Sequence, residues 1–207
     1  MLSTMALPNE YTVTWNIGNF GHLIKAIIGI EIYNLSVVSE GADTHDVTSG
    51  MHGMVDIIHP YESSKIKKDM KVIKPFFEKK ELKFLPIYLN HYKNKSINID
   101  PVEFAQTYWN HEEPKCDISY NIDMTNFFNN TDIFINNLHE FLQLSNLKQK
   151  TVDFIMQKKQ NNVSLYNRFN DIINNESKDL TPLERGVAIC YFADGDYNKV
   201  LEQSKNV

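Results

Sequence analysis

The residues best suited to binding chemistry lie in segment 16–22, which reads NIGNFGH and follows a stretch of β-branched and aromatic residues. Where a strand turns sharply into a helix, free backbone N–H groups and the helix dipole attract anions, and glycines let a phosphate come close. The segment therefore predicts an anion-binding turn made by Gly18, Asn19, Phe20, Gly21 and His22. A turn whose glycines serve only tight packing is the alternative, because a glycine pair alone is a weak motif.

The nucleotide-hydrolysing P-loop motif is absent from this turn. No lysine follows its glycines to reach a β-phosphate, and no hydroxyl stands where magnesium would be held. The sequence therefore disfavours an ATP- or GTP-hydrolysing machine and a phosphoryl-transfer kinase.

Three histidines are the candidates for acid–base chemistry. His45, His52 and His59 are spaced at seven-residue intervals with aspartates nearby. A neutral imidazole beside a carboxylate acts as a base near neutral pH. The tight ligand spacing of a zinc site is missing, so no metal is expected. Solvated loop histidines are the alternative to a catalytic base at His52 or His59.

The charge and composition of the chain limit the kinds of partner that it is expected to bind. The formal net charge is −5, and only two arginines occur, Arg168 and Arg185. Neither a nucleic acid nor a membrane is therefore an expected partner. With so few guanidinium groups, an anion site must use lysine, histidine or backbone N–H groups. No apolar run reaches the length of a membrane span and no leader pattern is recognisable, so a cytoplasmic location with free thiols at Cys116 and Cys190 is predicted.

These residues are positioned by an alternation of strands and helices. Strands are predicted at 11–15, 54–58, 71–73, 84–89 and 117–120, and helices at 23–33, 61–70 and 101–109, with a long loop at 39–53. Such alternation predicts an α/β fold, with a mostly parallel sheet and flanking helices. We expect one domain over 1–207, in which a helical part, 125–207, packs on a sheet-forming part, 11–120.

The last third of the chain reads as helices. Apolar residues recur at helical spacing over 125–142 behind Thr125 as a possible cap, and further helices are predicted at 148–159, at 163–175 and from 182 onward. Thr181, Pro182 and Glu184 form a capping-box pattern at the start of the last one. Segment 194–198 (DGDYN) begins like a calcium loop, but the later positions fail that pattern and favour a helix cap.

The order of elements resembles the sulfotransferase family. The strand, glycine turn and apolar helix over 11–33, and the passage from 117–120 through Asn129 and Asn130 into 133–144 (IFINNLHEFLQL), carry this resemblance. It implies the sulfuryl donor PAPS as cofactor, cradled by the turn at Gly18–His22, and a base at His52 or His59 near the carboxyl end of the second strand. Gly21 matches the family's glycine, whereas Asn19 and His22 stand where the family has a basic residue and a threonine.

Two functions follow from these observations. The first is a divergent sulfotransferase-like protein that binds a phosphorylated nucleotide or another anionic ligand at the first strand–helix turn. The second is a non-catalytic binding or assembly protein on the same scaffold, with a protein partner, encoded by a virus or phage with AT-rich coding. The fold alone does not choose between them.

Overall fold

The computed structural model describes residues 10–14, 20–36, 56–58, 70–77, 85, 120–174, 179–193 and 196–205. Its strands are β1 (Tyr11–Thr14), β2 (Asp56–Ile58), β3 (Lys71–Phe76) and β4 (Tyr120–Asp123). They form one sheet in the order β2-β1-β3-β4, and each neighbouring pair is parallel. With helices packed on this sheet and a helical last third, the α/β prediction is confirmed.

The two faces of the central strand β1 differ. Tyr11 and Val13 belong to the hydrophobic core, where the Tyr11 ring packs edge-on against Phe141 at 5.7 Å. Because side chains alternate along a strand, Thr12 and Thr14 point to the opposite face. The Thr12 hydroxyl donates there to the sulfur of Met70 at 3.0 Å. One face of the sheet is therefore apolar and covered by helices, and the other is more polar.

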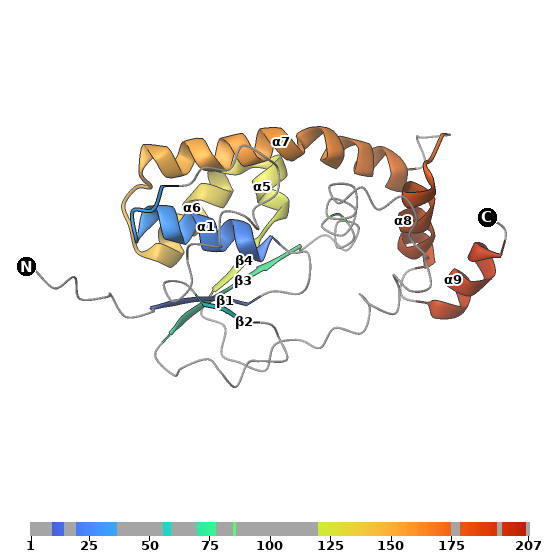
Figure 1. Cartoon of the computed structure of the whole chain (residues 1–207), viewed down its shortest axis with the longest axis horizontal. Coiled ribbons are helices and arrows are strands. Elements are labelled where there is room, and N and C mark those ends of the chain that lie inside the picture. Colours follow the sequence, from blue (N-terminus) through green and yellow to red (C-terminus); the bar gives the residue numbers. More distant parts are fainter. Residues whose placement is uncertain are drawn as a thin grey trace, which may run out of the picture.

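Helix α1 (Gly21–Glu31) is the most buried of the described helices. Ten of its eleven residues are buried, including Ile27 and Ile28. It packs on β1, β2 and β3 with one side and on α7 with another. Figure 1 shows α1 between the sheet and α7. The predicted helix at 23–33 is confirmed, and it both begins and ends two residues earlier than predicted.

The single helix expected from 125 is two helices, α5 (Thr125–Asn129) and α6 (Thr131–Leu142). Asn130 interrupts the helix and caps α6, since its side-chain oxygen accepts from Ile133 N at 3.3 Å. The sequence predicted Thr125 as a possible cap, but it is the first residue of α5, where its N–H donates to the Asp123 carboxylate. An asparagine such as Asn130 favours the capping position because its side chain hydrogen-bonds to nearby backbone N–H groups.

The helices expected at 148–159 and 163–175 are one helix, α7 (Gln149–Ile173), 25 residues long. Asn162 lies in its middle, where its side chain donates to Lys158 O at 2.7 Å without breaking the helix. A distant residue caps its N-terminus. The buried Glu31 carboxylate of α1 accepts from Lys148 N at 3.0 Å and from Thr151 Oγ1 at 2.5 Å. The Lys148 ammonium also donates to Glu31 O.

The capping box at the start of α8 (Pro182–Ala193) is confirmed. Glu184 N donates to Thr181 Oγ1 at 3.3 Å, and Thr181 N donates to the Glu184 carboxylate at 2.8 Å. The helix expected from 182 onward is two helices, and Asp196, in the segment expected to form a helix cap, caps the second, α9 (Tyr197–Ser204). One hydrophobic core cluster extends from β1 to α9, so the described parts of the sheet and of the helical third share a core.

The sequence misplaced several strand boundaries. β3 runs three residues further than predicted and includes Pro75, which lies beyond the pairing with β1 that ends at Ile73. β4 begins at Tyr120, where the predicted strand ended. Leu85 is helical and buried, so the strand predicted at 84–89 is wrong at this residue, the only one of the segment that the structure describes. The lysines and glutamates that precede it favour helix by propensity. The predicted loop at 39–53, the helix at 101–109, and Cys116 lie outside the described residues.

Candidate functional site

The strand order changes its direction of winding at β1. From the central strand β1 the next strand along the chain, β2, lies on one side, and β3 lies on the other. In open parallel sheets of this kind, ligands bind outside the carboxyl ends of the two strands where the direction of winding changes. The Phe20 ring, at the start of α1, lies 6.3 Å from the ring of Phe77, which directly follows β3. Helix α1 therefore begins at this edge of the sheet.

Phe20 holds an unusual backbone conformation. Its φ of 60° and ψ of 26° are left-handed, which costs a residue with a β-carbon about 1 kcal/mol or more. Its ring packs against Phe77, Phe127 and Phe128, with centroid separations of 5.8 to 6.3 Å. Such pairs each contribute about 0.5–1.5 kcal/mol, enough together to offset the strained backbone. The side chain of Phe20 thus belongs to the core, so an anion here would contact backbone groups.

Among the described residues, the N-cap position and the first turn of α1 lack the groups that usually satisfy a helix start. Phe20 supplies no side-chain cap hydrogen bond, and no acidic residue lies in the first turn. Gly21 is buried and His22 is half-buried. The first N–H groups of a helix have no partner within it and carry a partial positive charge. This arrangement suits an anionic group that approaches from the sheet edge.

Three of the five residues predicted for the anion-binding turn, Phe20, Gly21 and His22, are therefore consecutive at the start of α1. Gly18 and Asn19 lie outside the described residues, as do the predicted bases His52 and His59. Their roles stay predictions.

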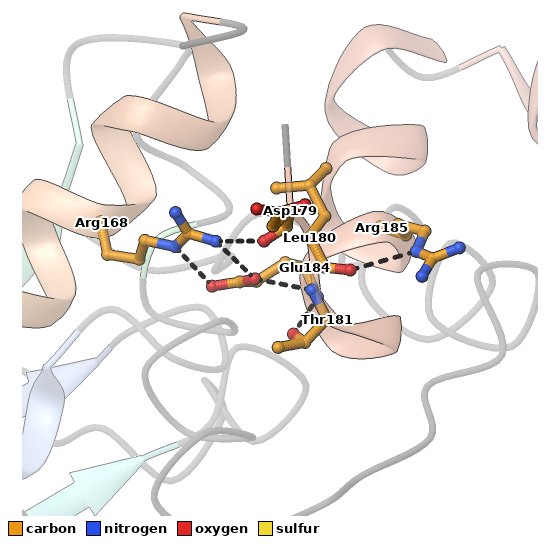
Figure 2. Close-up of polar contacts among 6 residues, drawn as sticks. All are labelled: Arg168, Asp179, Leu180, Thr181, Glu184 and Arg185. Atoms are coloured by element: carbon orange, nitrogen blue, oxygen red, sulfur yellow. Dashed lines mark hydrogen bonds and ion pairs between the residues drawn. The ribbon is translucent and has the colours of Figure 1, made fainter. Parts of the chain in front are cut away.

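A second polar constellation joins the end of α7 to the start of α8 (Figure 2). The Arg168 guanidinium grips the Glu184 carboxylate with two bonds, Nε to Oε1 at 2.8 Å and Nη2 to Oε2 at 2.9 Å. Nη2 also donates to Asp179 O at 2.9 Å. The bidentate geometry fixes the α7–α8 junction as well as neutralising Glu184.

Electrostatics at this junction favour the ionised carboxylate. Burial alone would raise the pKa of Glu184, but hydrogen bonds from Arg168 and from the Thr181 N–H outweigh it and lower the pKa below its ordinary value of 4.5. Beside it is an open hollow of about 560 Å³ lined by Asp179, Leu180, Thr181 and Arg185. Arg185 donates through Nε to Leu180 O at 3.2 Å. The ion pair at this junction therefore stabilises the contact between α7 and α8, and an open hollow lies next to it.

Sequence reasoning missed two polar residues on the second face of the sheet. Thr14 is fully buried at the carboxyl end of β1, and its hydroxyl has no hydrogen-bond partner. Lys74 of β3 is 9% exposed. Since Val13 pairs with Ile73 and the strands are parallel, Lys74 comes level with Thr14 on the same face. Only the strand register reveals this pair, because the two residues are far apart in the sequence.

Within the described part of the chain, no group of three or more metal-ligating side chains comes together, and no helix is long and apolar enough to cross a membrane. Comparison with known families, curated proteins and solved structures finds no match to this chain. The resemblance to sulfotransferases therefore stays a prediction from the sequence.

Proposed function

We propose that the chain binds a small anionic ligand, a phosphorylated nucleotide or a molecule with a similar oxyanion, at the N-terminus of α1. The observation that supports this most is the start of α1. It lies at the carboxyl edge of β1 and β3 and has neither a side-chain cap nor an acidic residue in its first turn.

The sulfotransferase resemblance extends this proposal to chemistry. In that version the ligand is PAPS and the base that activates an acceptor hydroxyl is His52 or His59. The base must lie within hydrogen-bond reach of the hydroxyl proton that it removes.

Phe20 favours the second candidate, a non-catalytic binding or assembly protein. The family has small and polar residues in its donor turn, whereas the Phe20 ring packs on Phe77, Phe127 and Phe128. A turn filled in this way leaves backbone N–H groups as the main contacts for an anion. Binding without group transfer needs nothing more.

Titration with 3′,5′-adenosine bisphosphate, followed by calorimetry and by the melting temperature, tests the binding proposal. Ligand at 100 times its Kd adds about 2.7 kcal/mol to the free energy of unfolding. Adenosine is the control, because it carries the base and sugar without the phosphates. Absence of any heat or melting shift at millimolar adenosine bisphosphate and millimolar phosphate would rule the proposal out.

Two matched variants locate the ligand. His22→Glu puts a negative charge in the first turn of α1 and is expected to abolish binding, since it repels an anion and interacts with the same helix dipole. His22→Gln keeps the polar side chain and the backbone N–H and is expected to retain binding. Equal affinity in both variants would place the ligand elsewhere.

A further inference from the structure

We infer that the Thr14 hydroxyl, with Lys74 level with it on the adjacent strand, is a second binding group for an oxyanion at the carboxyl edge of the sheet. This inference rests on the proposed function and names side chains that hold the same ligand from β1 and β3.

Thr14 is a buried polar group that the fold leaves unsatisfied. Its side chain is fully buried, and its Oγ1 is one of three buried side-chain atoms among the described residues that lack a hydrogen-bond partner. Folded proteins pair nearly all such atoms, because a buried hydroxyl without a partner is destabilising. A hydroxyl kept in this state therefore calls for a partner that the chain itself does not supply.

The neighbour on the same strand and face shows the contrast. Thr12 is also fully buried, but its hydroxyl donates to Met70 Sδ at 3.0 Å. Thr12 lies one side-chain repeat further from the carboxyl edge of the sheet. Of the two threonines on this face of β1, the satisfied one is internal and the unsatisfied one is at the edge where ligands of parallel sheets bind.

Lys74 supplies the charge that an oxyanion needs. The pairing of Val13 with Ile73 brings Lys74 level with Thr14, and Lys74 itself pairs with Asn121 of β4. Lys74 is a buried residue, with only 9% of its surface exposed. A hydroxyl and an ammonium on adjacent strands bind a phosphate or sulfate group through one neutral and one charge-assisted hydrogen bond.

Thr14 lies at the same edge of the sheet as the start of α1. The chain leaves β1 after Thr14 and enters α1 at Gly21, so both features flank the same carboxyl edge. The ligand class is thus a molecule with at least one phosphate or sulfate group. Inorganic phosphate and 3′,5′-adenosine bisphosphate are the two probes, because they separate binding of the oxyanion from binding of the nucleoside.

Thr14→Val is the test, since valine has the same shape without the hydroxyl. The expected result is a rise of about tenfold in Kd for both probes, the loss of one hydrogen bond to a charged ligand. Without ligand, the melting temperature should equal or exceed that of the wild type, because an unsatisfied buried hydroxyl has been removed. Thr12→Val is the matched control, with unchanged Kd and a slightly lower melting temperature.

Lys74→Gln is expected to raise Kd by about tenfold and to reduce its dependence on salt, whereas Lys74→Arg keeps most of the affinity. Unchanged Kd in Thr14→Val would overturn the inference, because the hydroxyl would then not contact the ligand. A melting temperature below that of Thr12→Val would also overturn it, because the hydroxyl would then stabilise the fold. If the wild type binds but Thr14→Val binds equally, the proposed function survives and the inference fails. If the wild type binds neither probe, both fail.

Discussion

The N-termini of α1 and α8 are built in opposite ways. At α8, Thr181 and Glu184 cap each other and Arg168 neutralises the carboxylate. At α1, Phe20 supplies no side-chain cap and the first turn has no acid. Caps use the same N–H groups and the same dipole that would attract an anion. A helix N-terminus that is capped by side chains of the chain itself gains stability. A helix N-terminus without such a cap keeps its partial positive charge available to a ligand.

The largest expected effect is at α8. Glu184→Ala removes half of the capping box and leaves Arg168 without its bidentate partner, and it should lower the free energy of unfolding by about 3 kcal/mol. Urea unfolding at neutral pH measures it. Glu202→Ala, which removes an exposed carboxylate on α9, is the control and should cost less than about 0.5 kcal/mol. Equal losses in the two variants would mean that the junction contributes nothing particular.

The two arginines of the chain sharpen the comparison within the junction. Arg168→Lys keeps the charge but loses the planar fork, and it is expected to cost about 1–2 kcal/mol. Arg185→Lys, on the same junction, changes a residue that makes one bond to Leu180 O and should cost less than about 0.5 kcal/mol. The same urea experiment compares them. A larger loss in Arg185→Lys would reverse the roles assigned to the two side chains.

The pH dependence of stability tests the ionised state of Glu184. Because its pKa is lowered in the folded protein, its contribution is complete above its ordinary value of 4.5 and is lost as the pH falls through the lowered value. The difference in unfolding free energy between wild type and Glu184→Ala should therefore shrink on acidification from about pH 6 to about pH 3. A difference that grows in acid would contradict the ion pair.

Thr181→Ala is expected to cost about 1 kcal/mol, because it removes the hydroxyl that accepts from Glu184 N while the ion pair with Arg168 stays. Thermal unfolding is sensitive enough to measure it. Thr181→Ser keeps the acceptor and should be close to wild type. If both variants lose the same stability, the methyl group rather than the cap is responsible.

The smallest effect is expected at α1 itself. Without ligand, His22→Glu should raise the free energy of unfolding by up to about 0.5 kcal/mol, since an acid now faces an uncapped helix start. His22→Gln should show no such gain. A loss of stability in His22→Glu at neutral pH would indicate that the start of α1 is already satisfied, and the contrast with α8 would disappear.

The features that the sequence predicted correctly are local ones. The capping box at Thr181 and Glu184 spans three residues, and the apolar helix after β1 follows a short-range periodicity. The partner of Glu184, by contrast, comes from α7, and the cap of α7 is Glu31, 117 residues before Lys148. Such contacts are set by packing, which no short pattern encodes.

In the candidate site, too, the sequence predicts the local features, whereas the contacts between distant residues depend on the fold. The sequence predicted Gly21 and His22 in the turn before the helix at 23–33, and they are the first two residues of that helix in the structure. The left-handed Phe20 and its aromatic contacts depend on Phe77, Phe127 and Phe128, which reach it only through the fold. Thr14 and Lys74 become neighbours through strand register alone, so the sequence offered no sign of them.

The bond between Glu31 and the start of α7 has a consequence for synthesis of the chain. Helix α1 is made early, but the residues that bind its last turn, Lys148 and Thr151, leave the ribosome more than a hundred residues later. Until then its isoleucine-rich surface lacks the cover that α7 provides. The nascent protein therefore carries an incomplete apolar layer through most of translation, a period in which chaperones have a surface to hold.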